Sequence, residues 1–168
     1  GEIAALADWT AGIACLTEGA MADATVCFDR AAAGFAALGA AGAAAQTQVP
    51  KIAALSMLGR HDEAAACARD AHAAFMALGD RQAAGRVSLN LGTLHWRRGD
   101  YAQAASHSRE AVLLFARAGD REHSVMADIG LADALTALGD HDEALRVYAR
   151  ASMRAATHGL PVLEAIAG

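Results

Sequence analysis

The sequence LNLGTLHWRRGDYAQAASHSREAV, from Leu89 to Val112, contains the features from which the fold can be predicted. Its Gly99-Asp100 pair separates two helix-forming segments. Glycine adopts the left-handed backbone that ends one helix, and an aspartate side chain accepts the unpaired N–H groups that begin the next. Ala104 and Ala111 follow seven residues apart, which places them on one face of a helix. The stretch therefore predicts two helices joined by a tight turn.

The same glycine recurs at every twentieth position of the chain. The eight members of this series are Gly19, Gly39, Gly59, Gly79, Gly99, Gly119, Gly139 and Gly159. Aspartate follows four of them, at Asp80, Asp100, Asp120 and Asp140. A fixed period of this length is typical of a helical solenoid, in which each short unit is stabilised by packing on its neighbours.

Alternate units differ, so the full period is forty residues. Three columns of residues occur only in the second helix of each pair. They are Ala24, Ala64, Ala104 and Ala144; Ala31, Ala71, Ala111 and Ala151; and Phe35, Phe75 and Phe115, followed by Ala155. Small residues let helices approach closely, and phenylalanine fills the space where they diverge. We therefore expect an all-α fold of four antiparallel helix hairpins, at residues 1–40, 41–80, 81–120 and 121–160.

The composition narrows the class of protein. A net charge of −5 argues against a nucleic-acid surface, which needs concentrated basic residues. The three cysteines lack CxxC spacing, so we expect buried thiols in a reducing cytoplasm, without a metal or another cofactor. The uncharged stretch 31–50 is as long as a membrane span, but its glycines, glutamines and Pro50 favour a helix end, a turn and a second helix. We expect a soluble protein.

The stretch from Leu89 to Val112 resembles the tetratricopeptide repeat. The matching residues are Leu91, Gly92, Gly99, Asp100, Tyr101, Ala104 and Ala111. The forty-residue period indicates the longer-helix subgroup, similar to kinesin light chain and to sensor regions of bacterial regulators. The column that holds tryptophan in the family departs from it, with Asp8, Gln48, Ser88 and Asp128. The resemblance implies a right-handed superhelix whose concave face is lined by the first helix of each hairpin.

The resemblance also implies a peptide-binding groove. Mapping that face gives Arg86, Leu89, Asn90, Thr93, Trp96 and Arg97 in the third hairpin, and Met126, Ile129, Gly130, Asp133 and Ala137 in the fourth. As binding residues we select Arg86, Asn90, Thr93, Trp96, Arg97 and Asp133. The Asn90 amide can grip a peptide backbone because it donates and accepts hydrogen bonds, and Trp96 and Arg97 are types that anchor interfaces. Alternatively, Asn90 caps a local backbone group and Trp96 covers a seam between hairpins.

These features predict a protein-interaction or peptide-interaction module, acting as a scaffold or sensor in a larger bacterial signalling protein. The alternatives are a small-molecule or short-peptide sensor and a self-association module. We expect no enzyme activity, since the histidines are better explained by packing: His61 and His141 occupy a turn column, and His95 faces inward.

Two further expectations concern the last eight residues of the chain and Pro50. Residues 161–168 read as the start of a truncated fifth repeat or a capping helix, whose apolar face could pair with a second copy. We therefore expect the chain to be part of a longer protein. Pro50 falls inside an expected helix, where proline removes a backbone hydrogen bond. A kink or a break is expected between Gln46 and Pro50.

Overall fold

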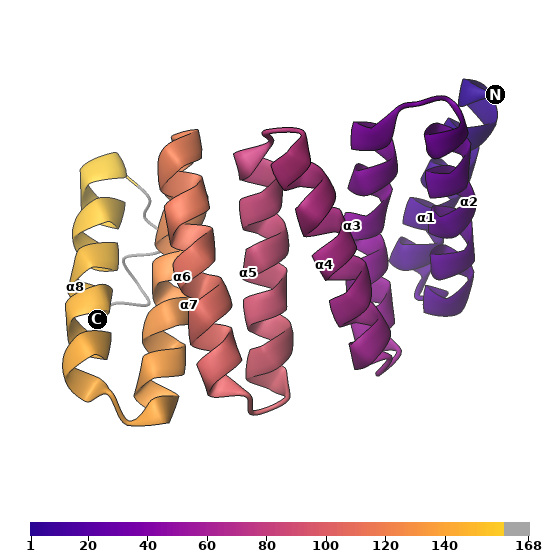
Figure 1. Ribbon diagram of the computed structural model, residues 1–168. Coiled ribbons are helices and arrows are strands. Elements are labelled where there is room, and N and C mark those ends of the chain that lie inside the picture. The colour runs from indigo at the N-terminus through magenta and orange to yellow at the C-terminus, as the bar shows by residue number, and fades with distance from the viewer. Residues whose placement is uncertain (160–168) are drawn as a thin grey trace. The chain divides into compact units, whose positions relative to one another are not determined.

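The computed structural model describes residues 1–159, and within them it contains eight α-helices and no strand (Figure 1). The chain divides into two compact units, Gly1–Asp80 and Arg81–Gly168, called unit 1 and unit 2 below. The helices of unit 1 are α1 (Glu2–Glu18), α2 (Met21–Ala37), α3 (Ala41–Met57) and α4 (His61–Ala77). Those of unit 2 are α5 (Arg81–Arg97), α6 (Tyr101–Ala118), α7 (Arg121–Leu138) and α8 (His141–His158).

Within each unit, every helix packs on the helix that follows it, and the two first helices of the hairpins also meet: α1 with α3, and α5 with α7. Each turn contains one glycine of the twenty-residue series. All eight have positive φ angles, from 62° at Gly159 to 82° at Gly19 and Gly139. Because L-residues with a side chain avoid this backbone region, the glycines end the helices as predicted. The expected all-α solenoid of helix hairpins is confirmed.

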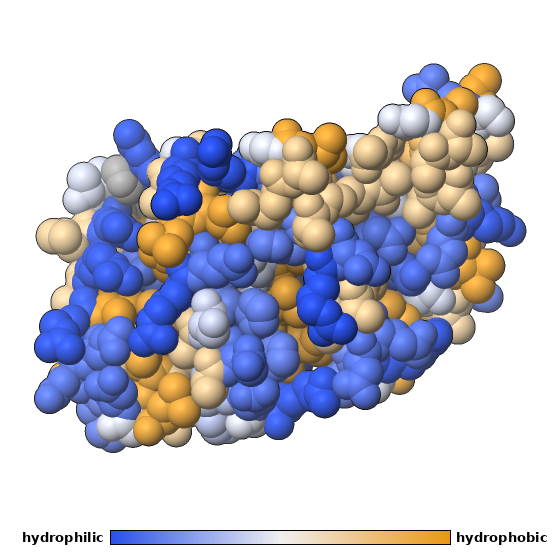
Figure 2. All heavy atoms as spheres, viewed as in Figure 1, coloured by the Kyte–Doolittle hydropathy of each residue, from blue (hydrophilic) through white to orange (hydrophobic). Residues whose placement is uncertain are grey.

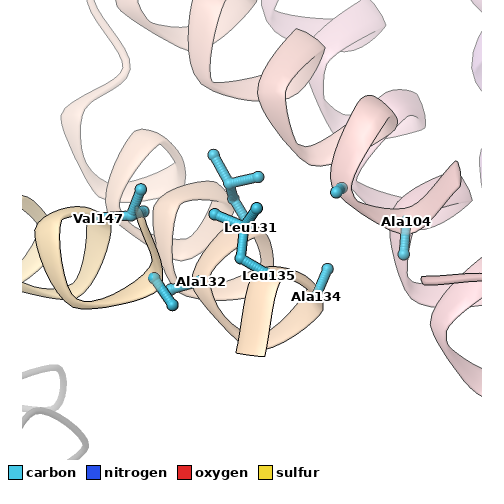
Figure 3. Packing of buried hydrophobic residues seen from close by; sticks show 8 residues of the cluster. Ala104, Leu131, Ala132, Ala134, Leu135 and Val147 are labelled. Carbon is cyan, nitrogen blue, oxygen red and sulfur yellow. The ribbon is translucent and has the colours of Figure 1, made fainter. Parts of the chain in front are cut away.

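The alanine and phenylalanine columns form the contacts between helices. Ala31, Ala111 and Phe115 are completely inaccessible to solvent, and every other member of the three columns is buried. Figure 3 shows one such cluster in unit 2, where Leu131 and Leu135 of α7 lie between the small side chains of α6 and Val147 of α8. Burial of each large side chain contributes about 1.5–3 kcal/mol. On the face drawn in Figure 2, patches of exposed hydrophobic residues lie between hydrophilic ones.

The helix starts of the two units differ in their caps. In unit 2, Asp100, Asp120 and Asp140 each accept a hydrogen bond from the backbone N–H three residues later. In unit 1, the corresponding positions before α2, α3 and α4 hold Ala20, Ala40 and Arg60, and none provides a side-chain cap. The predicted aspartate caps are therefore confirmed at three helices of unit 2.

At the repeat position where the family has tryptophan, this chain has polar residues. Each of them contacts the second helix of its own hairpin. Asp8 pairs with Arg30 at 2.7 Å, and Ser88 donates a hydrogen bond to Glu110 at 3.0 Å. In the second hairpin, the Cys67 thiol donates to the Gln48 side-chain oxygen at 3.1 Å. These three hairpins thus have polar links at the position where the family has tryptophan.

The fourth hairpin has the most elaborate of these links. The Asp128 side chain is completely buried and pairs with Arg150 at 2.6 Å and Arg154 at 2.8 Å. Arg154 also donates a hydrogen bond to the Ser124 hydroxyl at 3.3 Å. Since both arginines reach Asp128 from α8, this cluster fixes α7 against α8.

Of the kink or break expected between Gln46 and Pro50, the break is wrong, because α3 continues without interruption from Ala41 to Met57. Buried residues lie on both sides of the proline, including Thr47 and Ile52. Of the three cysteines, Cys27 and Cys67 are buried as expected, and Cys15 is half-buried. Burial raises the pKa of the Cys67 thiol to about 11.

None of the described helices combines the length and apolar character that a membrane span requires. Residues 161–168 and the self-association expected of them lie outside the described part.

Candidate functional site

A hollow of about 200 Å³ lies in unit 2 between α5 and α7. Its lining residues come from α5, from α6 at the floor, and from α7. They are Leu89, Gly92, Thr93, Trp96, Ser108, Gly130 and Asp133. We call this space the α5–α7 hollow.

The hollow exists because small residues meet on three helices. A Cβ atom added to Gly92 would lie 3.0 Å from the Ser108 hydroxyl oxygen, and one added to Gly130 would lie 3.4 Å from the same atom. These distances show that Gly92, Gly130 and Ser108 face one another. Any longer side chain at these positions would occupy the space.

The first hairpin of unit 1 shows the same position filled. Ser108 corresponds to Phe28, eighty residues earlier, and Gly92 corresponds to Gly12. A Cβ atom on Gly12 would lie only 2.6 Å from the Phe28 ring, which is completely buried. Phe28 therefore occupies the volume next to its glycine, whereas Ser108 leaves that volume open. The sequence signal for the hollow is a serine in the column of Phe28, Ala68 and Tyr148.

The walls of the hollow combine an aromatic ring, an aliphatic side chain and a carboxylate. The Trp96 side chain is 39% exposed, and its ring centroid lies 5.0 Å from that of Tyr101. Leu89 is half-buried. Among the described residues that line the hollow, Asp133 is the only charged one. An apolar space with one carboxylate can bind a group that is partly apolar and partly cationic.

Tyr148 on α8 holds the Asp133 carboxylate in place. Its hydroxyl donates a short hydrogen bond to that carboxylate. Burial raises the pKa of the Tyr148 phenol, and the hydrogen bond to Asp133 and its negative charge raise this pKa further. The phenol therefore stays protonated and neutral at physiological pH. The sequence analysis missed this role of Tyr148.

The structure separates the predicted binding residues into two groups. Thr93, Trp96 and Asp133 line the hollow, together with Leu89 and Gly130 of the mapped groove face. Asn90 and Arg97 are exposed on α5 but do not line it, and Arg86 is half-buried with no hydrogen-bond partner for its Nε. The other mapped residues, Met126, Ile129 and Ala137, also lie outside the lining. The sequence analysis missed Gly92 and Ser108 as site residues.

The structure also bears on the alternatives for Asn90 and Trp96. The Asn90 side chain makes no hydrogen bond within residues 1–159, so it caps no local backbone group there. Trp96 contacts Tyr101, the first residue of the next helix, and so covers part of the hairpin turn while lining the hollow.

Two histidines of unit 2, His95 and His107, pack on each other within the third hairpin. The rings of His95 and His107 are stacked, with centroids 5.2 Å apart, and His95 Nδ1 lies 3.4 Å from an Asp100 carboxylate oxygen. His95 therefore has the packing role that its position predicts. Among residues 1–159, no group of histidine, cysteine and acidic side chains is arranged to hold a metal ion.

Solved structures with the same fold include two Rap proteins. The apo form of RapI matches with a TM-score of 0.86 and 12% identity, over 93% of this chain and 44% of that one. The Rap conjugation gene regulator of plasmid pLS20, in complex with the Phr* peptide, matches with a TM-score of 0.77 and 21% identity. That alignment covers 99% of this chain and 46% of the regulator. This chain thus spans less than half the length of either protein.

A third similar structure contains the nearly identical TPR-like repeats of a Podosopora anserina protein described as a kinesin light chain. Its TM-score is 0.75 at 15% identity, over 94% of this chain and 77% of that one. At these identities the three likenesses establish the fold alone. No curated protein sequence matches this chain significantly.

A sequence-family comparison supplies the assignment. The tetratricopeptide repeat model matches residues 43–117 and again residues 83–155, which together make up more than half of the chain. These ranges include five glycines of the twenty-residue series, from Gly59 to Gly139, the alanine columns of the last three hairpins, and the α5–α7 hollow. The chain belongs to the tetratricopeptide repeat family.

Proposed function

We propose that this protein is an interaction module that binds an extended peptide segment of a partner along the face formed by α5 and α7. The observation that carries the proposal is the α5–α7 hollow, where Ser108 leaves open the volume that Phe28 fills in unit 1. A hollow of this size holds one peptide side chain. Pockets for drug-sized ligands are larger, about 300–1,000 Å³, so a peptide is favoured over a small molecule.

Three exposed side chains of α5 suit the rest of a peptide. Asn90 lies one residue from Leu89 of the hollow, and its amide is available to pair with a peptide N–H and C=O. Arg97 follows Trp96 and can pair with an acidic side chain or a terminal carboxylate. Trp96 supplies the large aromatic surface that often dominates binding energy at interfaces.

The comparisons favour a regulatory setting. One protein of the same fold is a conjugation gene regulator, and its structure contains a bound peptide. We propose that this chain is the scaffold or sensor part of a larger cytoplasmic signalling protein in bacteria. Its role is binding rather than catalysis, because the lining of the hollow contains neither a histidine nor a cysteine that could act with Ser108.

A displayed library of random heptapeptides tests the proposal. Selected peptides are measured by the fluorescence of Trp96 in a Trp9→Phe background, where it is the only tryptophan. We expect binding to change this emission. Asn90→Ala should weaken binding by about 1–2 kcal/mol, because a peptide group loses its partner. It should leave the melting temperature unchanged, since Asn90 has no partner within the described chain.

The matched control is Gln103→Ala, which removes an exposed amide from α6 instead of α5. Equal affinity of the selected peptides for Gln103→Ala and Asn90→Ala would overturn the proposal. A library that yields no binder would overturn it as well.

A further inference from the structure

We infer that the α5–α7 hollow selects a basic side chain of the bound peptide, arginine in preference to lysine. The inference rests on the proposed function and names the residue that the hollow would accept. It starts from Asp133, which brings the only formal charge to the lining.

The Asp133 carboxylate has a neutral partner, whereas three other aspartates of the described chain pair with a cation. Asp8 pairs with Arg30, Asp29 with Lys51, and Asp128 with two arginines. Within residues 1–159 the partner of Asp133 is the neutral hydroxyl of Tyr148, which binds one carboxylate oxygen, Oδ1. A half-buried carboxylate without a cation favours a ligand that brings one.

The other walls suit the rest of an arginine side chain. Leu89, Gly92 and Gly130 offer apolar surface to its methylene groups. Trp96 offers an aromatic face, and the guanidinium group stacks on such faces while its N–H groups pair with a carboxylate. Lysine can reach the same carboxylate, but its compact ammonium group stacks less well. The arrangement therefore ranks arginine first and lysine second.

Pools of pentapeptides with one fixed central residue test this inference. Each pool has the form Ac-X-X-Z-X-X-NH2, where X is random and Z is arginine, lysine, citrulline, leucine or glutamate. Citrulline keeps the shape of arginine without its charge. We expect the arginine pool to bind at least about tenfold more tightly than the citrulline pool, with lysine between them.

Two variants separate the charge from the space. Asp133→Asn should bring the arginine and citrulline pools to within about twofold of each other, because the charge-assisted hydrogen bond is lost. Asp142→Asn is the matched control, since it removes one exposed negative charge elsewhere in unit 2 and should leave the preference intact. Ser108→Phe should abolish binding of every pool.

The outcomes distinguish this inference from the proposed function. If the leucine or glutamate pool binds best and Ser108→Phe still abolishes binding, the groove binds peptides but the basic-residue inference is wrong. An arginine preference that survives Asp133→Asn would overturn it as well. If neither the pools nor the heptapeptide library binds, both ideas fail.

Discussion

The first hairpins of the two units have the same helix order, and a difference at one buried position separates a filled space from an open one. In unit 1, α2 places Phe28 against Gly12, and the ring fills the space beside the glycine. In unit 2, α6 places Ser108 against Gly92, and the same space becomes part of the α5–α7 hollow. The glycine permits the close approach in both hairpins, so the residue opposite it decides whether the space is core or site.

The two units also differ in how their helices are held. Unit 2 has three aspartate caps and a buried carboxylate with two arginines, whereas the three corresponding helix starts of unit 1 lack side-chain caps and α3 contains a proline. We infer that unit 2 is the more stable of the two, which suits the unit that contains the candidate site. The following predictions test this difference.

Pro50 should have the largest effect on unit 1. A proline inside a helix costs roughly 3 kcal/mol, because it removes a hydrogen bond and crowds the preceding turn. Pro50→Ala should therefore raise the free energy of unfolding of unit 1 by up to about that amount. In the unmodified protein, hydrogen exchange should be faster for the amides of residues 45–49 than for those of residues 87–91. Equal protection of the two segments would contradict the idea.

The polar links should differ in strength between the units. Asp128→Ala removes a fully buried carboxylate that accepts hydrogen bonds from two arginines, and should cost about 2 kcal/mol. Asp8→Ala removes a more exposed pair with Arg30 and should cost less than about 1 kcal/mol. Chemical denaturation of both variants measures the difference, and equal losses would show that burial does not strengthen the link in unit 2.

The glycines that face Phe28 and Ser108 should respond in opposite ways to alanine. Gly12→Ala places a methyl group against the Phe28 ring, and such overpacking should cost about 1–3 kcal/mol. Gly130→Ala meets only ordinary contact with Ser108, so the better helix propensity of alanine should stabilise unit 2 by up to about 1 kcal/mol. Thermal melts of the two variants should therefore shift in opposite directions; shifts of the same sign would mean that the space around Gly130 is not open.

Helix caps should be transferable from unit 2 to unit 1. Ala40 has φ −84° and ψ 64°, nearly the same backbone as Asp140, with φ −86° and ψ 67°. Ala40→Asp should therefore cap α3 and stabilise unit 1 by about 0.5–1 kcal/mol, and Asp140→Ala should cost about 1 kcal/mol. Denaturant midpoints test both changes. No gain from Ala40→Asp would show that the cap depends on more than local backbone geometry.

The fold could be predicted from the sequence because its rules are local and repeated. A glycine such as Gly99 needs a left-handed backbone wherever it ends a helix, and a column such as that of Ala111 marks a close helix contact in every hairpin. The uninterrupted α3 was not predicted, because packing on both sides of Pro50 outweighs the local preference.

The site was predicted only in part. Thr93, Trp96 and Asp133 could be mapped to one groove face from the resemblance to the tetratricopeptide repeat. The hollow itself depends on Ser108, a residue of the second helix. Its role becomes clear only when Ser108 and Phe28 are compared as the residues that lie opposite Gly92 and Gly12. The hydrogen bond from Tyr148 to Asp133 joins two helices, and the residue pattern of a single helix cannot predict such a contact.

Binding of the arginine pentapeptide pool to the Ser108→Phe variant tests most directly the claim that this open position is the binding site. Ser106→Phe is the control, because it adds the same ring to an exposed position of the same helix. We predict that Ser108→Phe abolishes binding of this pool without lowering the melting temperature, since Phe28 is accommodated beside Gly12 in unit 1. Ser106→Phe should bind normally. Unchanged peptide binding by a folded Ser108→Phe protein would contradict the account.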